Sequence, residues 1–353
     1  MSKLNKLPVI QDLNSYDILK QLIKTHQALA ELKGFSGVIP NKYILINAAM
    51  INEAKNSSEI ENIVTTHDEI YKAMSLNNSN KSAKEVVNYK EALWYGYQFI
   101  KENEYLSLNA IIKIQNIIES NDAGIRKTSG MVLRNMKTGE VVYEPPGNFV
   151  EIMELLTNLE TYINEKDDLD ELIRMAIIHY QFESIHPFYD GNGRTGRIIN
   201  VLYLTLKGLI DAPIIYISKY INKNKGNYYK YLQESRTQDN LEPFIIYMLK
   251  AVEETSINTL KLMKEMINLI EDIGLEIKEK LPKIYSKELI NVLFYEFYTK
   301  ISYVESGLSI SRKTASTYLI QLEEKGILTS KMVGRDKIYM NQRLYDLVKY
   351  MDF

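Results

Sequence analysis

The stretch His186-Pro-Phe-Tyr-Asp-Gly-Asn-Gly-Arg-Thr-Gly-Arg197 is the most informative segment of this 353-residue chain. It combines an imidazole that could act as a base, His186, with a carboxylate, Asp190, and a Gly-Asn-Gly turn. Gly191 and Gly193 permit backbone conformations in which N–H groups converge on an anion. The residues after the turn predict a helix, and a glycine turn that opens onto a helix N-terminus is a common phosphate cradle.

Two arginines of this segment support the same interpretation. Arg194 and Arg197 lie three residues apart, so on a helix they are neighbours that can hold one polyphosphate. A glycine turn alone is usually a helix cap, and an arginine pair alone is usually a solvated surface. Here the elements occur together and supply separate parts of phosphoryl chemistry. The chain has no P-loop and no kinase-like His-Arg-Asp loop, so it gives no support to γ-phosphoryl transfer by those routes.

The segment resembles the signature of the Fic family, His-x-Phe-x-Asp/Glu-Gly-Asn-Gly-Arg-x-x-Arg, and matches it at every defined position. The resemblance implies transfer of a nucleoside monophosphate, usually AMP from ATP, onto a protein hydroxyl. His186 would then deprotonate a Ser, Thr or Tyr of the target, which can be the protein itself, and pyrophosphate would leave. Asp190 would hold Mg²⁺, which needs few protein ligands. The resemblance assigns the phosphates of ATP to Asp190, Gly191, Asn192, Gly193, Arg194 and Arg197.

A second motif, Ser57-Ser-Glu-Ile-Glu-Asn62, lies far upstream and is similar to the inhibitory helix of many Fic proteins. The resemblance implies that Glu61 pairs with Arg197 and blocks the γ-phosphate, because one guanidinium cannot serve both a glutamate and a triphosphate. Ser57 and Asn62 complete this regulatory motif. An alternative is a capping box at Ser58 and Glu61 that only starts a helix. The two interpretations are compatible.

Three further features extend the resemblance to neighbouring segments. Short β-favouring runs at 132–133 and 141–143 flank a turn, which predicts a hairpin equivalent to the family's target-binding flap. Tyr228 and Tyr229 follow the signature at the place of the family's adenine-binding segment, and Arg236 is a further candidate there. Nucleobase pockets are mostly apolar and aromatic, although a tyrosine pair is more often simple packing.

Most of the chain has helical periodicity, with expected helices at 13–33, 43–54, 58–75, 83–101, 106–118, 149–164 and 168–185. We expect a mainly α fold: a Fic-type helical core with a small β-hairpin flap and a C-terminal winged-helix domain. The expected parts are an N-terminal helical region at 1–80 with the inhibitory helix, a catalytic core at 81–252, a connector helix at 253–283 and a winged helix-turn-helix domain at 284–353.

The expected winged helix has a recognition helix from Ser311 to Lys325. Its polar residues that could face DNA, together with one from the wing, are Arg312, Lys313, Thr314, Thr317 and Arg335. Residues 284–353 hold ten Lys plus Arg against eight Asp plus Glu, far from a strongly basic surface. Because winged helices also bind proteins, DNA and a protein both stay open as partners.

The composition limits the class of protein. The chain has no cysteine, so disulfides and thiolate metal sites are excluded, which agrees with a reducing compartment. Its net charge of −2 does not discriminate between partners. The N-terminus lacks the apolar run of a signal peptide, and no apolar stretch approaches the length of about eighteen residues that a membrane helix needs. We therefore expect a cytoplasmic protein without a membrane partner, and a homodimer stays open.

The leading hypothesis is thus a protein adenylyltransferase that uses ATP and Mg²⁺ and is held inactive by Glu61. One alternative is a DNA-binding transcriptional regulator in which the Fic core senses a nucleotide. Another is a Fic enzyme that removes AMP or uses a different phosphate-containing donor.

Overall fold

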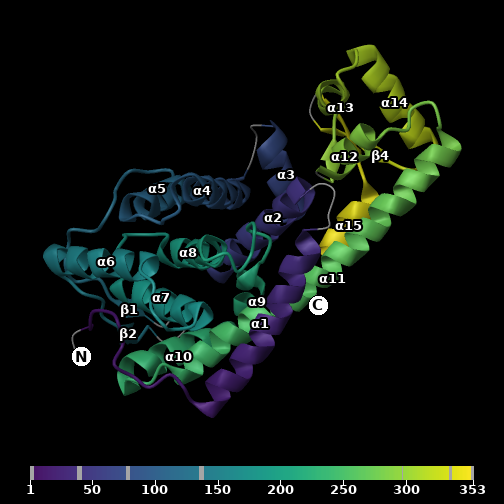
Figure 1. Cartoon of the computed structure of the whole chain (residues 1–353). Coiled ribbons are helices and arrows are strands. Elements are labelled where there is room, and N and C mark those ends of the chain that lie inside the picture. The colour runs from purple at the N-terminus through teal and green to yellow at the C-terminus, as the bar shows by residue number, and fades with distance from the viewer. Residues whose placement is uncertain are drawn as a thin grey trace. The chain divides into compact units, whose positions relative to one another are not determined.

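The computed structural model describes residues 4–37, 42–76, 80–134, 139–295, 297–333 and 336–350. They divide into two compact units, one within residues 1–33 and 50–257 and the other within residues 34–49 and 258–353 (Figure 1). The boundary at 257 and 258 falls inside one continuous helix, α11 (Glu242–Lys280). The segment expected as a separate connector is therefore, up to Lys280, the greater part of a longer helix.

The first unit is almost entirely helical, which confirms the expected fold class. Besides parts of α11, α1 (Tyr16–Ser36) and α2 (Lys42–Ile60), its elements are α3 (His67–Leu76), α4 (Lys81–Asn103), α5 (Leu108–Glu119), β1 (Leu133–Arg134), β2 (Val141–Tyr143), α6 (Phe149–Asn164), α7 (Glu171–Ile185), α8 (Asn192–Leu206), α9 (Ile217–Lys223) and α10 (Lys225–Gln238). Helices α1 and α11 contact each other within this unit, where Thr25 Oγ1 donates to the Leu249 carbonyl.

Helix α8 is the centre of this unit. It contacts α4 and α5 on one side and α7 on the other (Figure 1). Ile198, Val201 and Leu202 are completely buried, and burial of each such side chain contributes about 1.5–3 kcal/mol. Because α8 packs against α4, α5 and α7, these helices fix the position of the turn that precedes it.

The flap hairpin is present at the expected place, with its first strand one residue later than the sequence suggests. Strands β1 and β2 are antiparallel, with Leu133 opposite Tyr143 and Arg134 opposite Val141. The Arg134 guanidinium donates to the Gly139 carbonyl across the turn. Residues 135–138, at the tip, lie outside the described residues.

One prediction about the N-terminal helices was wrong. The sequence suggested helices at 43–54 and 58–75, but α2 continues to Ile60 and α3 begins only at His67. Ser58 therefore lies near the end of a helix and is completely buried, so it does not cap a helix start. Asn62 has a φ of 62° and closes α2 in the left-handed conformation, which Asn tolerates better than most residues. The capping-box alternative is thereby excluded.

The elements of the second unit within residues 284–353 are α12 (Lys287–Tyr295), β3 (Tyr298–Thr299), α13 (Ile301–Leu308), α14 (Arg312–Glu324), β4 (Thr329–Val333), β5 (Asp336–Met340) and α15 (Gln342–Tyr350). Helix α14 lies where the recognition helix is expected, whereas β3 and α15 were not predicted. The strands form an antiparallel sheet in the order β3-β5-β4. Ser311 caps α14 by accepting from the Thr314 N–H.

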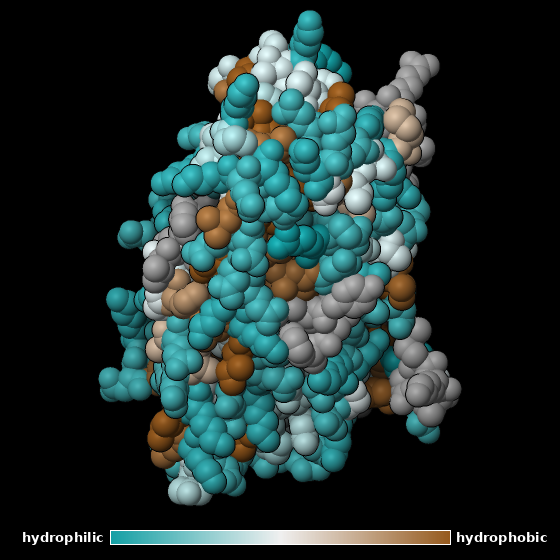
Figure 2. Space-filling model, turned by 90° about the vertical axis from the view of Figure 1, so that its right-hand side faces the viewer, coloured by the Kyte–Doolittle hydropathy of each residue, from teal (hydrophilic) through white to brown (hydrophobic). Residues whose placement is uncertain are grey.

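The face of the molecule shown in Figure 2 is mostly hydrophilic, and its hydrophobic residues form small separate groups. Among the residues described, no helix combines the length and apolar character needed to cross a lipid bilayer.

Candidate active site

The signature segment forms a rigid turn between α7 and α8. His186 ends α7 with a φ of 47°, and Gly191, with a φ of 77°, precedes the first residue of α8. The side chain of Asn192 locks the loop: its Oδ1 accepts from the Phe188 N–H and its Nδ2 donates to the Phe188 carbonyl, both at 2.8 Å. Phe188 is completely buried. These two bonds hold the side chain of Asn192 within the loop, and Nδ2 keeps a second N–H besides the one that it donates to Phe188.

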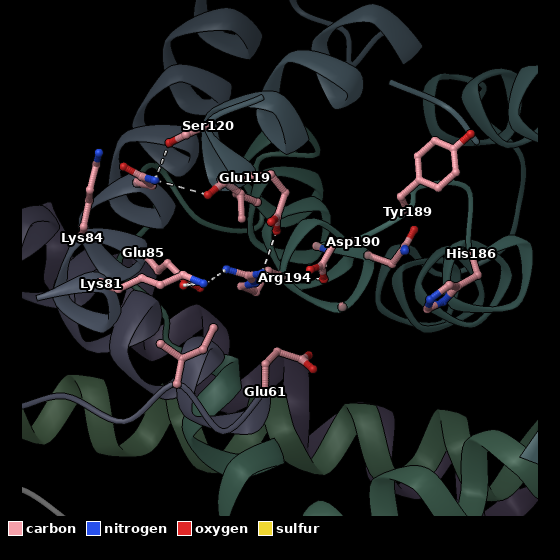
Figure 3. A pocket seen from close by; sticks show the side chains of 16 residues that line it. Glu61, Lys81, Lys84, Glu85, Glu119, Ser120, His186, Tyr189, Asp190 and Arg194 are labelled. Atoms are coloured by element: carbon pink, nitrogen blue, oxygen red, sulfur yellow. Dashed lines mark hydrogen bonds and ion pairs between the residues drawn. The ribbon is translucent and has the colours of Figure 1, made fainter. Parts of the chain in front are cut away.

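The turn borders a pocket of about 630 Å³. Figure 3 shows Asp190 between Arg194 and His186 in this pocket, with Glu61 projecting toward it from the end of α2. Lys81 and Glu85 line the pocket from α4, and Glu119 lines it from the end of α5. The pocket therefore gathers side chains from four separate parts of the sequence around one glycine turn.

His186 is suited to act as a neutral base. Burial, as the largest cause, together with the nearby guanidinium groups of Arg236 and Arg126 lowers the pKa of its imidazole to about 4. The imidazole is consequently uncharged at neutral pH and has a free pair of electrons to accept a proton. Arg126, which supplies one of these charges, was not singled out in the sequence.

Asp190 is available to a ligand. Its side chain is 80% exposed, and its Oδ1 accepts from the N–H of Gly191 at 2.7 Å. The described residues hold no group of three or more His, Cys, Asp or Glu side chains that could bind a metal by themselves. One carboxylate nevertheless suits Mg²⁺ that arrives with a triphosphate, because the phosphates and water supply the other oxygens.

Arg194 is held by two carboxylates that the sequence analysis did not identify. Its Nη2 lies 2.6 Å from Glu119 Oε1, and its Nη1 lies 3.1 Å from Glu85 Oε2. Glu119 also lies against the turn, since a Cβ added to Gly191 would be only 2.5 Å from its Oε1. The same carboxylate thus contacts both Arg194 and the first glycine of the turn.

Arg197 is held by the upstream motif, as the resemblance implied. Its Nη2 lies 2.8 Å from Glu61 Oε1, and its Nε donates to Ser57 Oγ at 2.7 Å. Nη2 also donates to the Ser57 carbonyl at 3.0 Å, one of the free carbonyls at the end of α2. A Cβ added to Gly193 would be 2.5 Å from Glu61 Oε1, so Glu61 covers the second glycine. Each glycine of the turn therefore faces one carboxylate.

The charges of Glu61 and Arg197 stabilise one another. Burial acts to raise the pKa of Glu61, but the Arg197 guanidinium outweighs it and lowers that pKa. Burial acts to lower the pKa of Arg197, and Glu61 raises it. Both groups are therefore charged at neutral pH, and Arg197 would be an unpaired buried cation without Glu61 or an anionic ligand.

The end of α2 is fastened to the rest of the unit by other contacts. The Lys225 ammonium donates to the Ile60 carbonyl, which places a cation at a helix C-terminus. Glu53, fully buried about two turns earlier, accepts from the Tyr89 hydroxyl and the Ser218 N–H, both at 3.0 Å. These contacts position Glu61 over the turn.

Of the three residues predicted to bind the nucleoside, only Tyr229 is substantially exposed. Tyr228 is buried, and its hydroxyl lies 2.9 Å from Nε2 of His179, which is itself completely buried. Arg236 donates to the Glu183 carbonyl and to Ser184 Oγ, and its guanidinium lies 4.0 Å from the centre of the Tyr143 ring. Tyr228 and Arg236 therefore serve packing in this structure rather than presenting a surface to a nucleobase.

The residues predicted to contact DNA belong to the second unit. Four of them lie on α14: Arg312, Lys313, Thr314 and Thr317. Arg335 lies outside the described residues. Arg312 is 3.9 Å from the Glu305 carboxylate, and Thr317 donates to the Lys313 carbonyl within the helix. DNA binding therefore stays a prediction.

A neutral histidine beside a glycine turn, with two arginines on the helix that follows, defines a phosphate-binding enzyme site in a helical fold. Three family models match the chain: the Fic/DOC family N-terminal model at residues 19–98, the Fic/DOC family model at 105–204, and the C-terminal domain of protein adenylyltransferase SoFic-like at 269–344. The chain belongs to the Fic/DOC family.

Relatives with similar sequences are named protein adenylyltransferases. The chain is 27% identical over 158 residues to protein adenylyltransferase Fic of Aedes aegypti, which covers 44% of the chain and 30% of that protein. It is 28% identical over 159 residues to protein adenylyltransferase fic-1 of Caenorhabditis elegans, which covers 43% of the chain and 28% of that protein. The matched region thus spans less than a third of either relative.

The fold is similar to that of a solved structure, a Fic family protein from Desulfovibrio desulfuricans. The two share a TM-score of 0.61 with 16% sequence identity, over 95% of this chain and 98% of the other. At this identity the likeness concerns the fold.

Proposed function

We propose that this protein is an adenylyltransferase that transfers AMP from ATP to a hydroxyl of a target protein or of itself, and that its resting state is inhibited by Glu61. The observation that carries the proposal is the arrangement of a neutral His186, an anion-binding turn and two arginines around one pocket, with Glu61 bound to Arg197 at 2.8 Å. The names of the relatives support the same activity.

The transfer step follows from the chemistry of these groups. The imidazole of His186 accepts the proton of the target hydroxyl, and the hydroxyl oxygen forms a bond to the α-phosphorus. The bond from this phosphorus to the oxygen that bridges to the β-phosphate breaks, and pyrophosphate leaves. The N–H groups of the turn and the dipole of α8 stabilise the negative charge that develops on the α-phosphate. Arg194 and Arg197 neutralise the leaving phosphates.

Mg²⁺, when bound with ATP, would shield the phosphate charges, and Asp190 is the residue that would hold it. Its exposed carboxylate at the mouth of the turn fits a hard cation that brings phosphate and water ligands.

The resting state explains how ATP could be kept from reacting. Both signature arginines are occupied by carboxylates, Arg197 by Glu61 and Arg194 by Glu119 and Glu85. A triphosphate must displace these carboxylates, or share the guanidinium groups with them, before its phosphates can adopt the pose that in-line attack requires. Release of Glu61 is the smaller change, because its carboxylate lies at the end of a helix and is 36% exposed.

The reaction type can be tested with ATP labelled at the α- or the γ-phosphate. The Glu61→Gly protein should incorporate the α-label into protein and release the γ-label as pyrophosphate. Incorporation of the γ-label instead would contradict AMP transfer and indicate a kinase-like reaction. No incorporation together with tight, salt-sensitive DNA binding would favour the regulator hypothesis.

A further inference from the structure

Arg126 is a completely buried arginine that touches the catalytic turn from outside the signature. Its Nε donates to the His186 carbonyl at 2.8 Å, and its Nη2 donates to the Ile185 carbonyl at 3.3 Å. Its own backbone N–H donates to the Pro187 carbonyl at 2.9 Å. One residue thus binds three consecutive carbonyls around His186.

These carbonyls need such a donor. They lie at the C-terminal end of α7, where no helical N–H is available to them. His186 itself is left-handed, with a φ of 47°, and a residue other than glycine pays about 1–2 kcal/mol for that conformation. A guanidinium at this place satisfies the carbonyls and interacts favourably with the negative end of the helix dipole. Arg126 therefore stabilises the backbone shape from which the imidazole projects.

The same guanidinium also contacts the end of the flap. Its Nη2 donates to the Pro146 carbonyl, three residues after β2. On the other side of the turn, Arg236 donates to the Glu183 carbonyl and stacks on Tyr143, the last residue of β2. The Tyr143 hydroxyl donates to the Ser184 carbonyl at 3.0 Å. The last turn of α7 and the end of the flap are thus joined by two arginines and one tyrosine.

We propose that Arg126 is a positioning residue that fixes His186 relative to the flap and so aligns the base with the target hydroxyl. This inference rests on the proposed function, because it assigns to the flap the role of holding the target. Arg126 does not line the pocket that holds the turn, Asp190 and Arg194. It should therefore affect the transfer step and leave the affinity for ATP unchanged.

The first test uses Arg126→Lys and Arg126→Met in the full chain that carries Glu61→Gly. A displacement of the base by about 1 Å can cost about 100-fold in rate, so the initial rate of self-labelling from α-labelled ATP should fall by about that factor in both variants. The dissociation constant of Mg-ATP, measured by calorimetry, should change by less than about threefold. A parallel loss of ATP affinity, or a rate that stays within about threefold, would overturn the proposal.

Arg174→Met provides the matched control. Like Arg126, Arg174 is a buried arginine, and it donates to the Tyr162 carbonyl at 2.8 Å. It belongs to α7 and lies three turns away from His186. The substitution Arg174→Met should lower the melting temperature about as much as Arg126→Met, without the loss of labelling rate. Equal kinetic losses in both variants at equal melting temperatures would show that Arg126 acts only through general stability.

A second readout does not depend on transfer. The chain has four histidines, and the NMR signal of His186 can be assigned from its loss in His186→Ala. The charged groups near this imidazole are Arg126, Arg236 and Glu61, and burial acts on it most strongly. Arg126→Met should raise the imidazole pKa from about 4 toward its ordinary value, while Arg126→Lys keeps the charge and leaves it low.

The labelling rate and the titration of His186 distinguish a failure of the proposed function from a failure of the role proposed for Arg126. Absence of labelling in the Glu61→Gly protein would contradict the proposed function, and the titration would still test the contact of Arg126 with His186. An unchanged imidazole pKa in Arg126→Met would show that the guanidinium is not held beside His186 as inferred.

Discussion

Glu119→Gln should strengthen the binding of Mg-ATP. In the resting structure the Glu119 carboxylate lies 2.6 Å from Arg194 Nη2 and against Gly191, in the space that a phosphate would enter. A phosphate that reaches Arg194 leaves Glu119 unpaired and close to another anion. Glutamine keeps the size of the side chain and removes its charge, which reduces both the cost of breaking the contact with Arg194 and the repulsion from the phosphate.

The magnitude can be estimated from the geometry. Two unit charges about 5 Å apart repel by about 3 kcal/mol at an effective dielectric constant of about 20. The hydrogen bond to a charged partner that the phosphate must break contributes about 1.5–3 kcal/mol. The new bonds of Arg194 to the phosphate and its remaining contact with Glu85 offset part of the repulsion and of the lost hydrogen bond. We expect a net gain of about 1.4 kcal/mol, which is about a tenfold lower dissociation constant.

The assay is calorimetric titration of Mg-ATP into the chain that carries Glu61→Gly and His186→Ala, so that ATP is not consumed. Glu85→Gln is the matched control, because Glu85 pairs with the same guanidinium at 3.1 Å but has a more exposed side chain and does not cover the turn. It should change the affinity by less than about threefold. Weaker ATP binding by Glu119→Gln would refute the reasoning and show that Glu119 orients Arg194 for the phosphates.

The remaining predictions concern the inhibitory helix, its pH dependence and the nucleoside. Lys225→Met removes the cation at the end of α2 and should raise basal labelling several-fold over the wild-type protein; unchanged basal labelling would show that this contact does not hold Glu61. Because the folded-state pKa of Glu61 is lowered from 4.5, its ion pair should stabilise the protein above that pH and lose this contribution as pH falls through the folded-state pKa. The difference in unfolding free energy between wild type and Glu61→Gln, from denaturant titrations, should therefore disappear in acid, and a difference that persists there would contradict an ionic contact. Tyr229→Ala should raise the dissociation constant of Mg-ATP about tenfold if the exposed ring stacks on adenine, whereas an equal loss for inorganic triphosphate would point to the phosphates instead.

Short-range patterns predicted much of this protein. The signature segment determines the shape of its own turn, because its two glycines lie next to Asn192, whose side chain bonds to the backbone of Phe188 in the same loop. Helical periodicity predicted α4 to α7 to within a few residues. The main error, the break between α2 and α3, arose because Ser57 and Ser58 resemble helix caps but are buried inside the unit. Arg197, to which Ser57 is bonded, is 140 residues away.

The missed site residues have the same cause. Glu119 and Arg126 reach the turn from segments about 75 and 60 residues upstream, and nothing in their local sequence distinguishes them from surface charges. The one available signal is position: both lie close to the end of an apolar helix that precedes the flap. Tyr228 and Arg236 were assigned to the nucleoside by position alone. In the structure Tyr228 packs against His179, and Arg236 packs against Tyr143.

The most direct test of the account compares labelling by α-labelled ATP and Mg²⁺ in three full-length proteins: wild type, Glu61→Gly, and Glu61→Gly combined with His186→Ala. We predict weak labelling of the wild type, strong labelling of Glu61→Gly, and none in the double variant. Labelling of the double variant at the level of Glu61→Gly would contradict the role of His186 as the base. Labelling of the wild type as strong as that of Glu61→Gly would contradict inhibition through the contact between Glu61 and Arg197.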